Sequence, residues 1–276
     1  MTPNNGRSIT VPRLVEDLEA AKLKGDEEIR RWASQHLNIE IGLGLQTDAW
    51  PGAPFWEANA DPSLTLDELI NRSEIVVVGI DGGGLDDLLG LAVLGREKIT
   101  RNWLHWGHAW AHESVFERRK DIAAILRDFE ADGDLTVVRR VGDDVQEVAD
   151  IVERLEETGL LPHEIAVGVD QAGISEIVDE LSQRGITPDR IGGVPQGWKL
   201  NNAIKTTERK LAGGALKHGG SRLLAWTIGN AITITKQVAG SAKIDPLMAL
   251  FDAVVAMGLN PDSHISVYES RGLRLV

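Results

Sequence analysis

The chain has 276 residues, a mass of 30.0 kDa and a formal net charge of −13 at pH 7. Its hydrophobic content of 42% is enough for a full core, and its length suits one large domain or one domain with an appended arm. Cysteine is absent, which excludes disulfides and thiolate zinc sites. No apolar stretch reaches membrane-spanning length and the first residues lack the apolar core of a signal peptide, so we expect a cytoplasmic protein.

The charge is unevenly distributed along the chain. From Thr187 onward there are 11 basic and 6 acidic residues, a balance of +5, whereas the preceding part has a balance of −18. An acidic body with a basic C-terminal third can still present a basic face to nucleic acid. Ordinary surface variation explains the same asymmetry equally well.

Residues 1–72 are expected to form an N-terminal helical arm or linker. Residues 11–36 have helical spacing and heavy charge. The tryptophan-, proline- and glycine-rich stretch at 49–56 cannot form a regular element because its prolines interrupt it. We expect its two tryptophans to pack against a neighbouring surface.

A single α/β domain is expected over residues 73–260, with a C-terminal tail over 261–276. Strands are predicted at 75–80, 88–94, 100–106, 135–141, 165–169, 190–194 and 231–238, with a turn at 95–98. Helices are predicted at 113–130, 144–158, 175–184, 203–216 and 246–257. Three antiparallel strands followed by alternating helices and strands is the order of the ribonuclease-H-like fold, a mixed sheet with helices on both faces.

Two predicted buried strands each end in an aspartate. The apolar run at 75–80 leads into Asp81 and three glycines, and the run at 165–169 leads into Asp170. A buried carboxylate needs a partner or a metal, and hard oxygen ligands suit Mg²⁺ or Mn²⁺. The pattern predicts carboxylates that converge on divalent metal, as two-metal phosphodiester cleavage requires.

Further acidic residues are candidates for the same site. Asp245 opens the last predicted helix before Pro246, so a plain helix cap is the alternative to a ligand. Asp252 lies seven residues further on, on nearly the same helix face. Asp86 and Asp87 follow the glycines and are either turn residues or auxiliary ligands.

Basic residues of the C-terminal third are candidates for DNA contacts. They are Lys199 and three residues expected on one helix, Lys205, Arg209 and Lys217, which would contact phosphates. A solvated helix face is the alternative. Lys243, beside Asp245, would either contact the scissile phosphate or balance the carboxylates.

Several motifs occur in the same order as in a known family. They are Val78-Gly79-Ile80-Asp81 with Asp87-Leu88, Gly168-Val169-Asp170-Gln171, Pro195-Gln196-Gly197-Trp198-Lys199-Leu200, Lys205 with Glu208, His218-Gly219-Gly220 with Trp226 and Asn230, and Lys243-Ile244-Asp245. Their succession resembles the nuclease domain of phage terminase large subunits. His36-Leu37-Asn38 and the region of Trp50 resemble the linker that precedes this nuclease.

The resemblance implies a metal-dependent DNA endonuclease that cuts concatemeric viral DNA during packaging. It implies Asp81, Asp170 and Asp245 as ligands of two Mg²⁺ or Mn²⁺ ions, and it favours Asp245 over Asp252. The implied partners are double-stranded DNA, a portal or procapsid, a small terminase subunit and a terminase ATPase domain. The implied location is the cytoplasm of a bacterial host, for a phage or prophage protein.

One departure concerns the ATPase of full terminases. No stretch fits Gly-x-x-x-x-Gly-Lys-Ser/Thr, and residues 1–72 are too few for an ATPase domain, so we expect a nuclease half alone. The glycines after Asp81 also replace the more polar loop of the family.

Other functions fit parts of the sequence. Residues 79–84 resemble the first phosphate motif of actin-like ATPase-fold sugar kinases, although no second glycine-rich loop stands out near the C-terminus. A ribonuclease-H-like resolvase or integrase and a catalytically silent DNA- or capsid-docking module are further alternatives. His105, His108 and His112 allow a zinc hypothesis, which we disfavour because they span a predicted strand end and loop.

Overall fold

The computed structural model describes residues 11–24, 32, 49–170, 175–231 and 243–262. The chain divides into two compact units, Met1–Ala49 and Trp50–Val276. In the first unit, helix α1 (Val11–Lys24) lies within the stretch that was predicted to be helical. The remainder of that prediction, apart from Trp32, lies outside the described residues.

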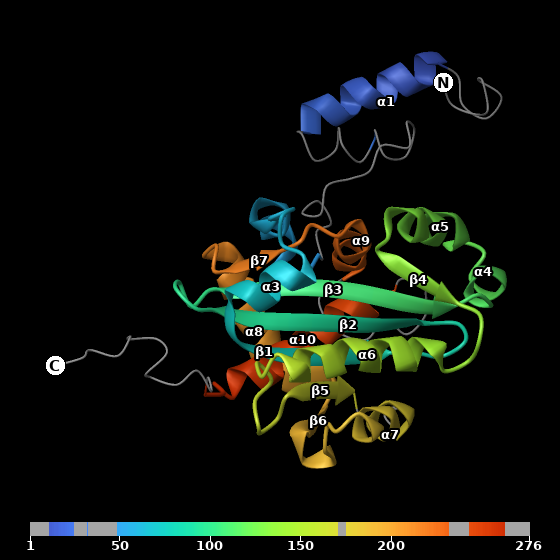
Figure 1. Cartoon of the computed structure of the whole chain (residues 1–276). Helices are drawn as coiled ribbons and strands as arrows, with labels where there is room; N and C mark the ends of the chain where they lie inside the picture. Colours follow the sequence, from blue (N-terminus) through green and yellow to red (C-terminus); the bar gives the residue numbers. More distant parts are fainter. Residues whose placement is uncertain (1–10, 25–31, 33–48, 171–174, 232–242, 263–276) are drawn as a thin grey trace. The chain divides into compact units, whose positions relative to one another are not determined.

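The second unit is built on a mixed sheet (Figure 1). Its order is β4-β3-β2-β1-β5-β6, with β7 beside β3. The strands are β1 Ser73–Gly82, β2 Leu88–Glu97, β3 Trp103–His112, β4 Leu135–Val138, β5 Val167–Asp170, β6 Ile191–Val194 and β7 Leu216–His218. β1, β2 and β3 are antiparallel neighbours, whereas β4 and β7 run parallel to β3, and β5 and β6 run parallel to β1. This arrangement confirms the predicted ribonuclease-H-like α/β fold.

Helices flank this sheet (Figure 1). They are α3 Leu66–Arg72, α4 Val115–Arg118, α5 Ala123–Asp132, α6 Asp143–Glu157, α7 Ser175–Gln183, α8 Asn201–Ala212, α9 Arg222–Asn230 and α10 Asp245–Gly258. Short 3₁₀ turns are η1 Ala53–Phe55, η2 Glu57–Asn59, η3 Pro188–Arg190 and η4 Gly197–Leu200. Within the described residues, no helix is long and apolar enough to cross a membrane.

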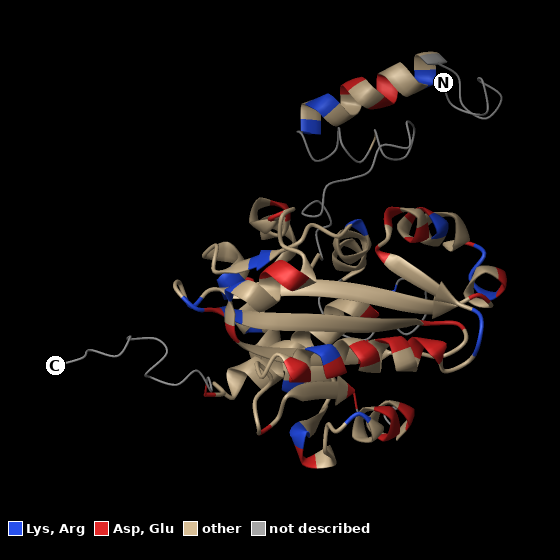
Figure 2. Ribbon diagram, in the orientation of Figure 1, with Lys and Arg blue, Asp and Glu red and all other residues tan. Residues whose placement is uncertain are grey.

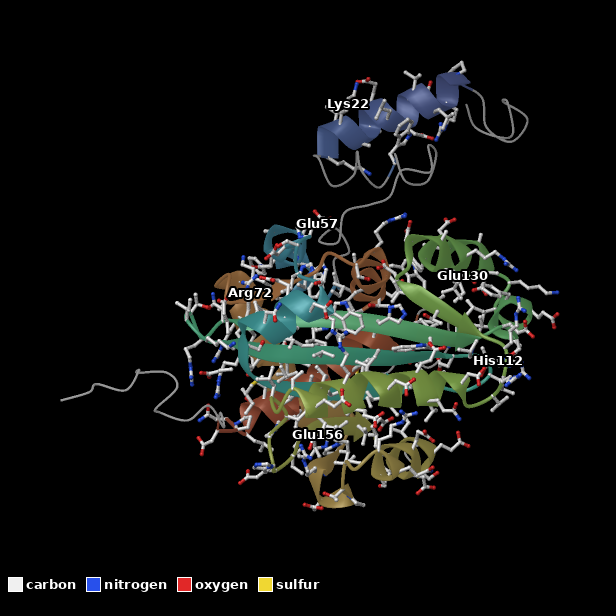
Figure 3. All side chains as sticks on the ribbon, in the orientation of Figure 1. Lys22, Glu57, Arg72, His112, Glu130 and Glu156 are labelled. Carbon is white, nitrogen blue, oxygen red and sulfur yellow. The ribbon has the colours of Figure 1, made fainter. Side chains whose placement is uncertain are left out.

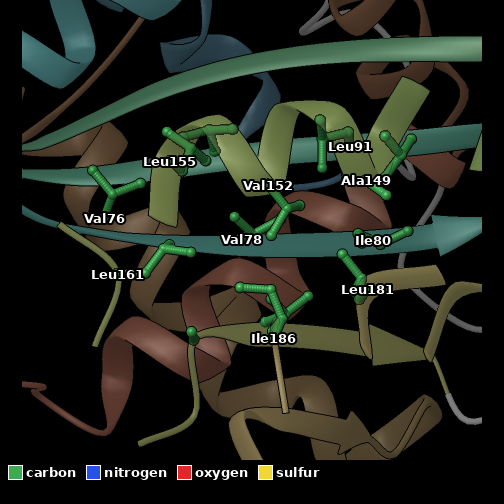
Figure 4. Packing of buried hydrophobic residues seen from close by; sticks show 14 of the residues in the cluster. Val76, Val78, Ile80, Leu91, Ala149, Val152, Leu155, Leu161, Leu181 and Ile186 are labelled. Carbon is green, nitrogen blue, oxygen red and sulfur yellow. The ribbon is translucent and has the colours of Figure 1, made fainter. Parts of the chain in front are cut away.

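One face of the sheet packs against α6. Val76, Val78 and Ile80 of β1 share a buried cluster with Val152 and Leu155 of α6 (Figure 4). Because side chains alternate along a strand, these even-numbered positions face α6 and leave Val77, Gly79 and Asp81 for the opposite face. The register of β1 therefore directs the Asp81 side chain away from α6.

The opposite face is covered by α10, whose backbone lies directly on the sheet. A Cβ atom at Gly79 would lie 1.9 Å from the Ala249 carbonyl oxygen, and one at Gly168 would lie 2.6 Å from that of Asp252. Gly79 and Gly168 are register partners on β1 and β5, so they form a contiguous side-chain-free strip. This strip lets α10 approach closely enough to bring its acidic residues to the strand ends.

Residues 50–72 pack on the sheet unit. Trp50 and Trp56 are each 1% exposed, as expected for tryptophans packed against a neighbouring surface. The ring of Trp50 lies edge-on to that of Phe251 of α10, with 5.6 Å between the ring centroids. The ring of Trp56 stacks on that of His218, with 3.7 Å between the centroids.

Arginine–carboxylate pairs connect elements at the edge of the sheet unit; Arg72 and Glu156, which belong to two of these pairs, are labelled in Figure 3. Arg72 of α3 donates to Glu97 at 2.6 Å, and Arg190 donates to both carboxylate oxygens of Glu156 at 2.7 Å. The hydrogen bond from Arg190 lowers the pKa of Glu156, although partial burial opposes this effect. The pairs tie α3 to β2 and α6 to the start of β6.

Several predicted boundaries were wrong. The predicted helix at 113–130 is interrupted between α4 and α5, where Arg119 donates to the backbone and carboxylate of Asp86. The turn predicted at 95–98 comes later, because Arg96 stays in β2 and is buried against Glu74. The third strand is therefore β3 at Trp103–His112 instead of 100–106.

The C-terminal part also differs from its predicted elements. β7 and α9 were not predicted as elements. The helix predicted at 203–216 ends at Ala212, so Lys217 lies on β7 and not on a helix with Lys205 and Arg209. Of the strand predicted at 231–238, all but Ala231 lies outside the described residues.

Candidate metal centre

The ends of β1 and β5 bring Asp81 and Asp170 together. The strands are parallel neighbours, with Ile80 opposite Val169, so the two aspartates follow at adjacent strand ends. Asp81 is 8% exposed and Asp170 is half-buried. The convergence predicted from the two buried strands is therefore present in the fold.

Asp245 reaches the same place from α10. A Cβ atom at Gly82, directly after Asp81, would lie 3.0 Å from the Asp245 Cβ. Asp245 is the first residue of α10, and Ile244 occupies the N-cap position before it. An acidic residue in the first turn of a helix is favourable by itself, so the helix-end role and the ligand role both remain as predicted.

Asp252 lies further along α10 and is fully buried, with 0% exposure. Neither of its carboxylate oxygens has a hydrogen-bond partner of ordinary geometry among the described residues, and the same holds for Oδ2 of Asp245. A buried carboxylate oxygen without a partner is costly unless it is protonated or bound to a cation. These oxygens are therefore the strongest indication of a cation site.

The electrostatics of both residues reflect their acidic surroundings. Burial and the charges of Asp87 and Asp81 raise the pKa of Asp245 well above its ordinary value of 3.8. Burial and the charges of Asp81 and Asp170 raise the pKa of Asp252 to about 9. Neighbouring negative charges and burial both disfavour the charged form of a carboxyl group, which is why both pKa values are raised.

Asp87 lies in the same cluster and forms an ion pair with Lys243. The Lys243 Nζ donates to Asp87 Oδ1 at 2.7 Å, and Lys243 is only 6% exposed. Asp87 Oδ1 also accepts from the backbone N–H of Leu88 at 2.9 Å. Its neighbour Asp86 turns outward and pairs with Arg119 at 3.2 Å. Of the two aspartates that follow the glycines, Asp87 is the one that belongs to the carboxylate cluster.

The cluster has the composition of a divalent-cation site. Asp81, Asp87, Asp170, Asp245 and Asp252 supply hard oxygen donors of the kind that Mg²⁺ and Mn²⁺ bind. Across the described residues, however, no three His, Asp or Glu side chains already stand together as a complete metal-ligand set. Binding a cation would therefore require side-chain rearrangement within the cluster.

Gln196 is a site residue that sequence analysis did not identify as one. Its Nε2 donates to Asp81 Oδ1 at 3.4 Å from the turn after β6. The same turn carries Trp198, which is 78% exposed. The motif around Gln196 was recognised only as part of a resemblance, because a glutamine in a loop has no chemical signature of its own.

A cavity adjoins the strand end. It has a volume of about 470 Å³ and is lined by Gly82, Gly83 and Gly84, by His112, and by residues at the starts of α6 and α7. The glycines after Asp81 have positive φ angles of 87°, 108° and 116°, which other residues rarely adopt. They keep side chains out of the space beside Asp81.

The predicted DNA-contacting residues occupy different environments. Lys199, Lys205 and Arg209 are exposed, and Lys205 pairs with Glu208 at 2.8 Å. Lys217 donates to Asn59 Oδ1 at 2.9 Å, and Lys243 is buried against Asp87.

The three histidines of the zinc hypothesis do not converge. His105 and His108 lie at positions of β3 with opposite side-chain directions. His108 bonds Thr136, whereas His112 bonds Ser114 and the backbone of Arg139.

Comparison with solved structures finds a similar fold in a large terminase. The chain is similar to the large terminase of bacteriophage HK97, with a TM-score of 0.57 and 20% identity over 74% of this chain. It spans 42% of that terminase's length. At this identity the similarity establishes the fold alone.

Weaker similarities are found to two terminase nuclease domains. The human cytomegalovirus terminase nuclease domain, soaked with Mn and bound to an inhibitor, matches with a TM-score of 0.42 and 13% identity over 76% of this chain and 94% of that one. The magnesium-bound large terminase nuclease of the thermophilic phage G20c matches with a TM-score of 0.41 and 15% identity over 66% and 80% of the two chains. No protein-family model matches the sequence, and no curated protein matches it either.

Proposed function

We propose that this chain is a metal-dependent DNA endonuclease that resembles the nuclease of terminase large subunits. The observation that carries the proposal is the buried carboxylate cluster at the ends of β1 and β5, where oxygens of Asp245 and Asp252 lack partners among the described residues. The similarity in fold to the HK97 large terminase supports it.

The cluster indicates which residues would hold the cations. Asp81 and Asp170 at the strand ends and Asp245 at the start of α10 would supply oxygen ligands to Mg²⁺ or Mn²⁺. Asp87 and Asp252 would serve as auxiliary donors in the same cluster.

The chemistry follows from this donor set. Divalent metal would act as a Lewis acid that activates water and stabilises the leaving oxygen of a phosphodiester. The protein's own residues would hold the cations, keep the strand end open through Gly82–Gly84, and balance surplus charge through Lys243. Metal binding must also displace the protons that the raised pKa values keep on Asp245 and Asp252, so activity should increase with pH.

DNA would approach the cluster beside the turn that carries Gln196. The exposed side chains there are Trp198 and Lys199, with Lys205 and Arg209 on α8 that follows. Contacts of this kind reach phosphates and sugars more than base edges, so sequence preference should be weak. Lys217 and Lys243 would act through their partners Asn59 and Asp87 and not through direct phosphate contacts.

In the biological context that the resemblance implies, the substrate is concatemeric viral DNA in a bacterial host. The cut would be made with a terminase ATPase domain, a small terminase subunit and a portal or procapsid. These partners are part of the proposal.

The test is nicking of supercoiled plasmid with Mn²⁺, Mg²⁺ or EDTA. We expect metal-dependent nicking that Asp81→Ala and Asp170→Ala abolish, whereas Asp86→Ala, which changes the outward-facing neighbour, retains it. A folded parent protein that nicks with neither metal would overturn the proposal and direct the next test to ATP binding, as the kinase alternative requires.

A further inference from the structure

Gln196 reaches the carboxylate cluster from the turn after β6. β6 pairs with β5, and β5 lies between β6 and β1. The Gln196 side chain nevertheless donates from Nε2 to Asp81 Oδ1 at 3.4 Å. Its amide is therefore oriented toward the cluster.

The same amide lies near a second carboxyl group, that of Asp252. No hydrogen bond of ordinary geometry joins the two among the described residues, so both Asp252 oxygens are available to a donor. The amide nitrogen has two hydrogens, and only one of them is needed for Asp81, so it can serve two carboxylates at once.

We propose that Gln196 is a positioning residue of the metal centre, whose amide donates to Asp81 and, when the cluster rearranges around a cation, also to Asp252, so that both carboxylates are oriented toward the cation. This inference rests on the proposed function, because it assumes that these carboxylates bind metal. It concerns a residue outside the aspartate set.

A neutral donor suits this role better than a cation. Lys243 already places one positive charge at Asp87, 2.7 Å from its Oδ1. A second cationic side chain between Asp81 and Asp252 would compete with metal for the same oxygens. Glutamine reduces the repulsion between the two carboxylates and leaves their negative charge for the metal.

The first variant removes the amide hydrogens and keeps the side-chain length. We expect Gln196→Met to weaken Mn²⁺ binding about tenfold, measured by titration calorimetry and by electron paramagnetic resonance of free Mn²⁺. Gln183→Met, at the exposed end of α7, is the matched control and should bind Mn²⁺ as the parent does. In nicking assays the Mn²⁺ concentration for half-maximal rate should rise about tenfold, with KM for DNA unchanged.

The second variant should lower the stability of the metal-free protein without weakening Mn²⁺ binding. Gln196→Glu adds a carboxylate beside Asp81 and Asp252, so the metal-free protein should melt at a lower temperature than the parent. Its Mn²⁺ affinity should equal or exceed that of the parent, because the new oxygens can act as ligands. A merely structural glutamine would not lower Mn²⁺ affinity in Gln196→Met and preserve or raise it in Gln196→Glu.

The outcomes separate the two proposals. A parent that binds Mn²⁺ and nicks DNA, with Gln196→Met equal to it in both, overturns the role of Gln196 alone. A folded parent that neither binds Mn²⁺ nor nicks overturns the proposed function itself. Weaker Mn²⁺ binding in Gln196→Met with full binding in Gln183→Met supports the inference.

Discussion

At the scale of single residues, two buried histidines on one side of the sheet should make the fold sensitive to acid. His105 is 1% exposed and neither ring nitrogen has a hydrogen-bond partner among the described residues. Burial lowers its pKa from 6.5 to about 3, and burial lowers that of His218 to about 4. Both residues are therefore neutral in the folded protein at pH values where the unfolded chain would protonate them.

We predict that His105→Leu reduces this sensitivity. The unfolded chain gains a proton on His105 below pH 6.5 and the folded protein does not, so the histidine's contribution is complete above pH 6.5 and is lost as the pH falls toward 3. The free energy of unfolding of the variant, relative to the parent, should rise by about 1.4 kcal/mol for each pH unit below 6. Urea unfolding in EDTA at pH 7.5, 6 and 5 measures this; a constant difference across that range would contradict it.

At the scale of elements, the placement of α10 depends on glycines. Gly79 lies under Ala249 and Ala253, where a Cβ atom would lie 1.9 Å and 2.4 Å from backbone atoms. Neither neighbour is a flexible side chain, so an added methyl group must push the whole helix. Because α10 carries Asp245 and Asp252, the same displacement would disturb the carboxylate cluster.

We expect Gly79→Ala to reduce the free energy of unfolding by about 3 kcal/mol or more. The matched control is Gly258→Ala at the end of the same helix, where an added Cβ has no atom within 4 Å and should be neutral or slightly stabilising. Denaturant unfolding of both variants compares them directly. Equal stabilities would show that α10 does not lie directly on β1.

A second prediction at this scale concerns the turn after β6. Trp198 is 78% exposed, so Trp198→Ala should leave the melting temperature nearly unchanged. If DNA contacts this turn, KM for DNA should rise about tenfold at similar kcat, as expected for loss of one stacking contact. Phe55→Ala, which removes a 42% exposed aromatic from η1, serves as the control and should not change KM.

The elements also show what the sequence could and could not predict. β1 and β5 were predictable because buried strands are continuous apolar runs, and each leads directly into its aspartate. β7 was missed because three residues, including a lysine and a histidine, carry no periodic signal. The break between α4 and α5 depends on Arg119 reaching Asp86, a contact between residues 33 apart that no local pattern encodes.

At the site too, some residues could be predicted from local sequence patterns, whereas others become apparent only in the folded structure. Asp81 and Asp170 follow from strand patterns, but the choice between Asp245 and Asp252 was left open because both are acidic positions on one helix. The structure places both at the cluster, since the glycine strip on β1 and β5 lowers the helix onto the sheet. The role of Gln196 depends on its contact with Asp81, 115 residues away in the sequence, which only the fold shows.

At the scale of the whole molecule, charge limits where a nucleic acid can bind. α6 carries seven acidic residues and one arginine, and α7 is also acidic (Figure 2). These two helices repel phosphates, so DNA should avoid them and approach from the turn that leads into α8, with its exposed Lys199, Lys205 and Arg209. The side of the molecule that carries Lys199, Lys205 and Arg209 is therefore more favourable for a phosphate backbone than the side that carries α6 and α7.

The carboxylate cluster also connects metal to the stability of the whole fold. The pKa of Asp252 is about 9 in the folded protein and 3.8 ordinarily, so its contribution to stability falls as the pH rises from about 4 to 9. At pH 8 the metal-free protein is therefore destabilised by this carboxyl, and a cation that binds only the folded state should restore stability.

We predict opposite effects of Asp252→Asn with and without metal at pH 8. In EDTA the variant should melt several degrees above the parent, because the buried amide has no proton to lose. With Mn²⁺ at about one hundred times its dissociation constant, the parent should gain about 2.7 kcal/mol, and the variant should gain less because one ligand is missing. Differential scanning fluorimetry with EDTA, Mn²⁺ and Mg²⁺ measures both effects. A parent whose melting temperature is the same in EDTA and in Mn²⁺ would show that the buried carboxylates are not a metal site, whatever the similarity of the fold.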